Sequence, residues 1–143
     1  MKFNIFINDK TIHEAAEIVH NHYKSARFLD SVYFSKPFNL CRSTPPMVAA
    51  EILKADIIMD IVPYKTKWPW SKVIGYASGD TIYVNTRKLD LPLADRVENF
   101  MHEGLHLLGY SHKGNTNNEF NRGTVPYAVS ALLVKYLKSI GKL

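Results

Sequence analysis

Three histidines and one glutamate lie within the short segment His102–His112, which reads HEGLHLLGYSH. His102 and His106 are four residues apart, so on a helix their imidazoles lie one turn above the other and can reach a single metal ion. Zinc binds imidazole nitrogens at about 2.0–2.1 Å, and three protein ligands with an open fourth position are typical of catalytic zinc. The spacing therefore predicts two ligands of such a site.

The third ligand has to come from beyond the end of this helix. On a continuous helix His112 would lie too far along the axis, but Gly109 can adopt the left-handed conformation that ends a helix and turns the chain back. We therefore predict His112 as the third ligand. Glu103 lies beside His102, where it can take a proton from water on the metal, and is the predicted general base. A structural role is the usual alternative for a helical histidine, but the offsets of Gly109 and His112 favour a metal site.

This motif resembles the HExxHxxGxxH signature of the metzincin clan of zinc peptidases and matches it at every specified position. The preceding GYASGDTIYVN is similar to the edge strand and following strand that come before the active-site helix in that clan. The resemblance covers about residues 72–112 and implies a small zincin-like domain with zinc as cofactor. It implies zinc ligation by His102, His106 and His112, with Glu103 as general base and acid. The residues that it implies for binding an extended peptide substrate by strand addition are Gly75, Tyr76, Ala77 and Ser78.

One part of the metzincin pattern is missing. The clan carries a methionine in a turn under the metal, whereas this chain has no methionine after Met101, and Val125 of TVPYAVS takes the corresponding position. Tyr127 in the same stretch corresponds to a tyrosine that faces the metal in some members. It is therefore a candidate for stabilising the oxyanion, and packing at the start of a helix is the alternative interpretation.

The segment LHLLGYSH also resembles the second half of HGxLHLxGYDH, a motif of bacterial endoribonucleases that mature ribosomal RNA. Those enzymes have glycine in place of Glu103 and aspartate in place of Ser111, and we do not find their upstream signature of arginine and proline. The basic residues that could hold RNA are Lys65, Lys67, Lys72, Arg87 and Lys88. Glu103 favours a peptidase with a peptide or protein substrate. A zinc-dependent single-strand endoribonuclease is the alternative, and a purely structural zinc site is a third.

The composition fits one globular domain, because 46% of the 143 residues are hydrophobic. The net charge of +5 could attract an acidic partner but is common among proteins, so a nucleic-acid partner is not expected. The first ten residues lack the unbroken apolar stretch of a signal peptide, and no segment is long enough to span a membrane. We therefore expect a cytoplasmic protein without a membrane partner.

Strands are predicted at four places in the chain. Alternating apolar residues indicate a strand over 2–8, and a run rich in Ile and Val indicates a buried strand over 55–62. The stretches 72–78 and 81–86 predict two strands joined by a tight turn at Gly79.

Three helices are predicted from apolar spacing and end signals. The first begins at the N-cap Thr11 with Glu14 in capping-box position, the second covers 93–108, and the third covers about 126–140. This order of elements predicts an α/β (α+β) domain over residues 1–143, with a mixed sheet, an active-site helix and a C-terminal helix.

Two loops and one cysteine complete the predictions. The segment 35–47 is predicted to be a loop because of its prolines. Trp68 and Trp70 in PYKTKWPWSK are expected to pack over the sheet, and a wall of the substrate pocket is the alternative. Cys41, the only cysteine, excludes an internal disulfide and fits a reducing compartment. A thiol that blocks the zinc, as in latent metzincins, is less expected than a buried, unreactive one.

Overall fold

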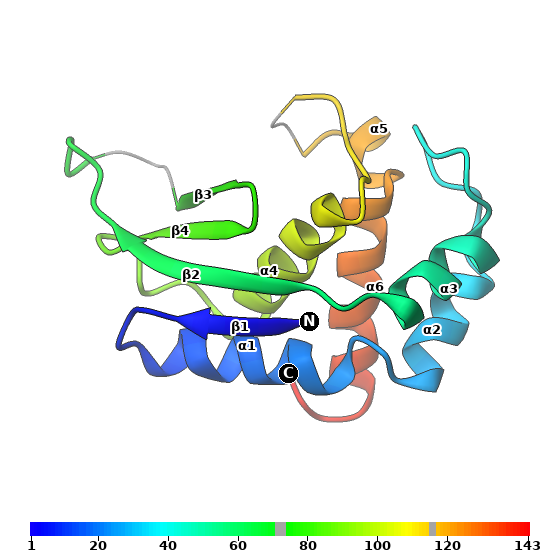
Figure 1. Ribbon diagram of the computed structural model, residues 1–143, viewed down its shortest axis with the longest axis horizontal. Coiled ribbons are helices and arrows are strands. Elements are labelled where there is room, and N and C mark those ends of the chain that lie inside the picture. The colour runs from blue at the N-terminus through cyan, green and yellow to red at the C-terminus, as the bar shows by residue number, and fades with distance from the viewer. Residues whose placement is uncertain (71–73, 115–116) are drawn as a thin grey trace.

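The computed structural model describes residues 1–70, 74–114 and 117–143, which form six helices and a four-stranded sheet (Figure 1). The elements, in chain order, are β1 (Lys2–Ile5), α1 (Lys10–His22), α2 (Ala26–Tyr33), α3 (Pro45–Lys54), β2 (Ile58–Tyr64), β3 (Gly75–Ser78), β4 (Thr81–Asn85), α4 (Leu93–Leu107), α5 (Glu119–Arg122) and α6 (Val125–Ser139). The predicted α+β class with a mixed sheet is confirmed. Within these residues no helix combines the length and the apolarity needed to cross a membrane.

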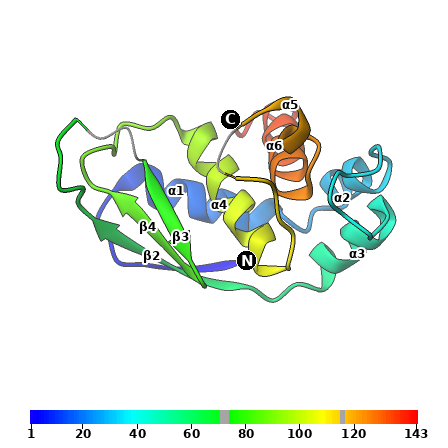
Figure 2. The same ribbon diagram turned by 90° about the horizontal axis from the view of Figure 1, so that it is seen from above.

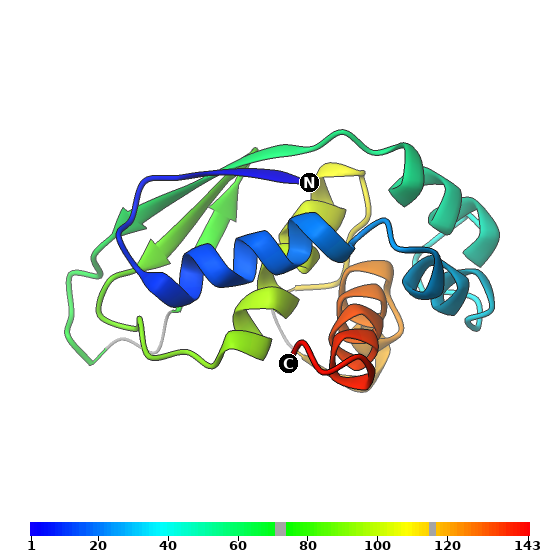
Figure 3. The same ribbon diagram turned by 90° about the horizontal axis from the view of Figure 1, so that it is seen from below.

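The sheet has the strand order β1-β2-β4-β3, with β3 at one edge. The strands β1, β2 and β4 run parallel, and β3 pairs antiparallel with β4 through the predicted turn, where Gly79 has φ +59°. Helices α1 and α4 lie on one face of the sheet, and no helix of the described residues covers the other (Figures 2 and 3). Among the described strands β3 pairs only with β4, so its other edge is open, which matters for the site.

The core lies between the sheet and the helices. In β2, Met59 and Ile61 are buried while their neighbours are more exposed, as expected for a strand with one covered face. Helix α4 contributes a buried stripe with the spacing of a helix, namely Val97, Phe100, Met101 and Leu105. This stripe packs α4 against α1 and α6. The packing fixes the rotation of α4 about its axis, and with it the direction in which the other side of the helix faces.

The predicted start of the first helix is wrong. Asp9, and not Thr11, is the N-cap: its backbone is extended, and its carboxylate accepts a hydrogen bond of 2.9 Å from the N–H of Ile12. Glu14 therefore lies too far along the helix to complete a capping box. Thr and Asp are both good N-caps, and two candidates so close together cannot be distinguished from the apolar spacing alone.

Three helices were missed by the sequence patterns. Helix α2 follows Ser25, and α3 begins at Pro45, inside the segment that was predicted to be a loop. The two prolines at the start of α3 occupy its first turn, where a missing N–H has no hydrogen bond to lose. The third is the short helix α5.

Two other predictions changed in extent or environment. The strand predicted over 55–62 begins at Ile58, and Lys72 and Val73 of the predicted third strand lie outside the described residues. Trp68 and Trp70 do not pack over the sheet, since 55% and 74% of their surfaces are exposed.

The N-cap assignment makes a prediction about stability. Replacing Asp9 with Ala should lower the free energy of unfolding by about 0.5–2 kcal/mol, because the N–H of Ile12 loses its acceptor. Thr11→Ala is the matched control and should change it much less. Urea denaturation of both variants measures the difference, and a larger loss for Thr11→Ala would contradict the assignment.

Candidate metal centre

Helix α4 presents two histidines and a glutamate on the side that faces away from the core. His102, Glu103 and His106 are half-buried and line a cleft, while Met101 and Leu105 on the other side of the helix are fully buried. Gly104 lies between the two histidines and faces Met1, where an added Cβ would lie 2.6 Å from the Met1 sulfur. The glycine of the HEGLH sequence thus allows close packing beneath the site.

The chain turns back directly after α4, as predicted. Gly109 has φ +90°, a conformation that residues with a side chain rarely adopt, and its N–H bonds to the carbonyl of His106 at 2.9 Å. The N–H of Tyr110 bonds to the carbonyl of Leu105 at 3.3 Å. This turn returns His112 to the two histidines of the helix.

The three predicted ligands meet through their Nε2 atoms. The Nε2 of His102 lies 3.2 Å from that of His106 and 3.2 Å from that of His112, and the remaining pair is 3.1 Å apart. In the described part of the chain, this is the one group of histidine, cysteine or acidic side chains close enough to hold a metal ion.

Backbone carbonyls determine which ring nitrogen of each histidine carries the proton. The Nδ1 atom of His106 lies 2.7 Å from the carbonyl of Tyr110, and that of His112 lies 2.6 Å from the carbonyl of Gly114. His102 is hydrogen-bonded to the backbone of Pro126, which offers only its carbonyl. Because a carbonyl accepts but cannot donate, the proton of each neutral ring is on the nitrogen that faces this carbonyl.

The three Nε2 atoms therefore point bare lone pairs at one another. Burial, followed by repulsion from His106 and His112, lowers the pKa of His102 to about 3, so this ring is neutral near pH 7. Lone pairs at 3.1–3.2 Å cannot form hydrogen bonds among themselves, whereas one ion at about 2.0–2.1 Å from each nitrogen would satisfy all three. The residues thus fit a divalent metal with three protein ligands and an open position toward the cleft.

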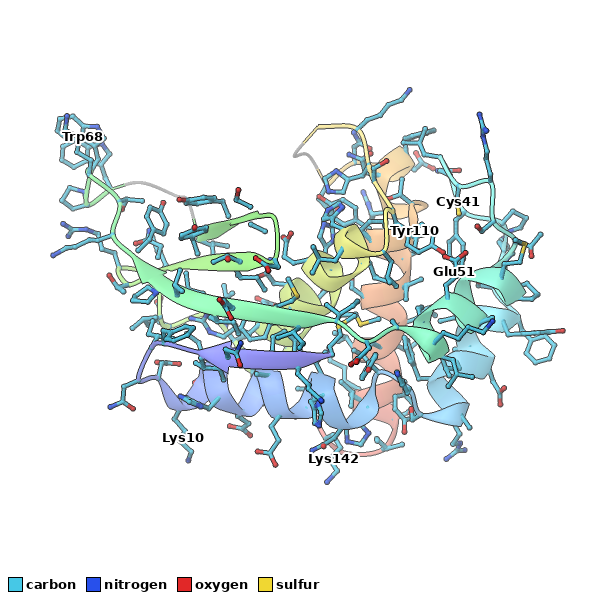
Figure 4. The ribbon with its side chains drawn as sticks, in the orientation of Figure 1. Lys10, Cys41, Glu51, Trp68, Tyr110 and Lys142 are labelled. Carbon is cyan, nitrogen blue, oxygen red and sulfur yellow. The ribbon has the colours of Figure 1, made fainter. Side chains whose placement is uncertain are left out.

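Two polar contacts hold the loops that carry these carbonyls. Tyr110 donates a hydrogen bond to Glu51 of α3 (Figure 4), and burial together with this carboxylate raises the pKa of the tyrosine. The fully buried Asn121 of α5 bonds to both backbone groups of Lys113, at 3.0 and 2.7 Å. The first contact fixes Tyr110, whose carbonyl faces His106, and the second fixes Lys113, the neighbour of His112.

Glu103 lies next to the group of three histidines without belonging to it. Burial raises the pKa of its carboxyl group, and the nearby His112 opposes that shift. Its carboxylate accepts a hydrogen bond of 3.5 Å from the side-chain amide of Asn99. A half-buried carboxylate of raised basicity that faces the cleft can accept a proton.

Tyr127 lies in the first turn of α6, with its ring against two of the three histidines. Its ring centroid is 4.6 Å from that of His102 and 5.0 Å from that of His112, and it lines the cleft. Val125, two residues earlier, is buried. The tyrosine therefore faces the histidines, and its packing at the helix start does not exclude a contact with a bound molecule.

The cleft has a volume of about 750 Å³ and lies between α4 and the edge strand β3. Of the four residues predicted to bind substrate, Gly75, Tyr76 and Ala77 line the cleft, while Ser78 lies in β3 outside this lining. A side chain at Gly75 would collide with the carbonyl of Tyr83, so glycine permits β3 to approach β4 here.

Sequence reasoning missed a polar part of the cleft. Asp95, Glu98 and Asn99 of α4 line it, and burial raises the pKa of Glu98. The spacing of three and four residues between these positions and His102 places them on one helix face, which is the signal that could have identified them.

Basic side chains are absent from the described lining of this cleft. Lys65, Lys67, Arg87 and Lys88 lie elsewhere, and Lys72 is outside the described residues. Cys41 is not in the histidine group either: its thiol donates to the carbonyl of Ser43 at 3.4 Å, near Tyr110 (Figure 4). A blocking thiol therefore finds no support in this arrangement.

Comparisons of the chain with protein-family models, curated proteins and solved structures found no match. The geometry of the site is therefore the basis for assigning a function.

The histidine group makes a prediction about metal content. Protein purified without chelator should contain about one metal ion per chain, and His106→Ala should lose most of it because two nitrogens bind much more weakly than three. His13→Ala, which removes an exposed histidine of α1, is the matched control and should keep the metal. Elemental analysis decides, and equal metal in the His106→Ala and wild-type proteins would contradict the site.

Proposed function

We propose that this protein is a zinc-dependent peptidase of the metzincin type that hydrolyses peptide bonds of extended polypeptides. The observation that carries the proposal is the group of three imidazoles, His102, His106 and His112, whose Nε2 atoms converge beside Glu103. Zinc, when bound, would supply Lewis acidity toward a carbonyl group and toward water.

The edge strand would hold the substrate in this proposal. Strand β3 uses one edge for β4, and its other edge borders the cleft at Gly75 and Ala77. An extended peptide could add to this edge through backbone hydrogen bonds, which do not depend on the peptide sequence. The scissile carbonyl would then lie over the C-terminal half of α4.

Glu103 would transfer the protons of the reaction. It accepts a proton from the attacking water as the water oxygen bonds to the carbonyl carbon, and it returns this proton to the leaving nitrogen as the C–N bond breaks. Tyr127, beside His102 and His112, would donate a hydrogen bond to the oxyanion that forms in between.

The charges of the cleft support a peptide over RNA. Asp95, Glu98 and Glu103 line it, and carboxylates repel the phosphates of a nucleic acid. The same carboxylates would attract a polypeptide with lysine or arginine near the cleavage point.

The unpaired Cys41 further supports our proposal of a reducing compartment such as the cytoplasm.

The first test removes the base. Glu103→Gln should reduce cleavage of an unstructured polypeptide mixture by about 10²–10⁴-fold, because the amide cannot accept the proton. Its metal content should equal that of the wild type, since Glu103 is not a ligand. New peptide termini are identified by mass spectrometry.

The same preparations are assayed with single-stranded RNA in parallel, where we expect no cleavage. Cleavage of RNA that disappears in His106→Ala, with every peptide left intact, would overturn the peptidase in favour of the endoribonuclease. Unchanged peptide turnover by Glu103→Gln would refute the role of this residue alone.

The second test concerns Tyr127. Replacing it with Phe should lower kcat by about 10²–10³-fold and leave KM and metal content nearly unchanged, because the lost hydrogen bond forms mainly in the transition state. Tyr136→Phe in the same helix is the control. A wild-type kcat for Tyr127→Phe would restrict this ring to packing.

A further inference from the structure

Two exposed tryptophans form the end of the loop after β2. Trp68 and Trp70 stack on each other with ring centroids 5.3 Å apart, and 55% and 74% of their surfaces face solvent. Figure 4 shows Trp68 at the end of the molecule farthest from α2 and α3. More than half of each indole surface is left to solvent at a projecting point, which indicates a partner.

The surroundings of the pair are basic. The segment Lys65–Trp70 contains two lysines and no acidic residue, and both lysines are exposed. The ammonium of Lys67 lies 5.6 Å from the centroid of the Trp68 ring. The exposed Arg87 adds a third cation, because the N–H of its neighbour Thr86 bonds to the carbonyl of Tyr64, at the base of the loop.

The base of the loop is held in place by side-chain hydrogen bonds. The side chain of Thr66 donates to the carbonyl of Trp68 at 3.1 Å and accepts from the buried Asn85 of β4 at 3.3 Å. The loop is thus tied to the sheet while its end projects.

We propose that Lys65–Trp70, the tryptophan tip, binds membrane surfaces that are rich in anionic lipid. Indole rings favour the boundary between lipid headgroups and acyl chains, and lysines favour the negative surface of such membranes. Binding at the membrane surface needs no membrane-spanning segment. This proposal goes beyond the proposed peptidase activity and does not depend on it.

The geometry favours a membrane over single-stranded nucleic acid. A nucleic-acid platform needs free ring faces on which bases can stack. The Trp68 ring already stacks on Trp70 and has the Lys67 ammonium over it, so a base would have to compete with both contacts. Insertion of the pair into a headgroup layer leaves these contacts in place.

The chain offers an internal probe for the test. Both tryptophans of the protein lie in the tip, so its tryptophan fluorescence reports on this segment alone. Wild-type protein is mixed with vesicles of phosphatidylcholine, or of phosphatidylcholine and phosphatidylserine at about 3:1. We expect sedimentation with the anionic vesicles and a blue shift of the emission as the indoles leave water.

Variants distinguish membrane binding by the tryptophan tip from nonspecific adsorption of the protein to vesicles. Trp68→Ser/Trp70→Ser should bind anionic vesicles at least about tenfold more weakly, and Lys65→Glu/Lys67→Glu should lose about fivefold per lysine. Tyr33→Ser/Phe34→Ser removes another exposed, contacting aromatic pair and should bind as the wild type does. Circular dichroism verifies the fold of each variant.

Several results would overturn the proposal. One is an unshifted tryptophan emission with anionic vesicles, and another is equal binding by the two aromatic variants. Tryptophan quenching by an RNA oligonucleotide without vesicle binding would assign the tip to nucleic acid. A wild-type dimer that Trp68→Ser/Trp70→Ser dissociates, again without vesicle binding, would assign it to a second copy of the chain.

Discussion

Three imidazole nitrogens face one another at close range, and the site is organised around this constraint. The Nε2 atoms of His102, His106 and His112 lie 3.1–3.2 Å apart. Their ring protons are held on the far side by carbonyls from three places: the turn after α4, the loop before α5 and the first turn of α6. An ion bound here would stabilise all three segments at once, so metal binding would be coupled to the order of these segments.

The polar contacts around the site explain why elements far from the histidines matter to it. Glu51 of α3 accepts from Tyr110, whose own carbonyl orients His106. The side chain of the buried Asn121 bonds to both the backbone N–H and the carbonyl of Lys113, next to His112. It thus satisfies both groups, as a paired strand would. Helices α3 and α5, which lie outside the histidine motif, thus help to position the three histidines. The side-chain amide of Asn121 is fixed in turn because both its N–H and its oxygen are hydrogen-bonded.

The convergence of His102, His106 and His112 could be predicted from the sequence because their geometry is local. The spacing of His102 and His106 and the turn at Gly109 depend on a few neighbouring residues, and so does the hairpin of β3 and β4. The partners of Tyr110 and Lys113 could not be predicted, because Glu51 and Asn121 meet them only through the tertiary fold. The predicted start of α1 was wrong for a different reason. Asp9 and Thr11 are both suitable N-caps, and the backbone conformation decides which of them begins the helix.

The distribution of charge also shows why a net charge is a weak guide to partners. The chain carries +5 overall, which alone would suit RNA. Its described cleft nevertheless presents Asp95, Glu98 and Glu103 without a lysine or arginine, while exposed cations surround the tryptophan tip. A polyanion attracted to the basic end would have to enter an acidic cleft to be cut, whereas the proposed extended peptide would meet an open strand edge there. The separation of the two surfaces therefore argues for different partners at each, a polypeptide in the cleft and an anionic surface at the tip.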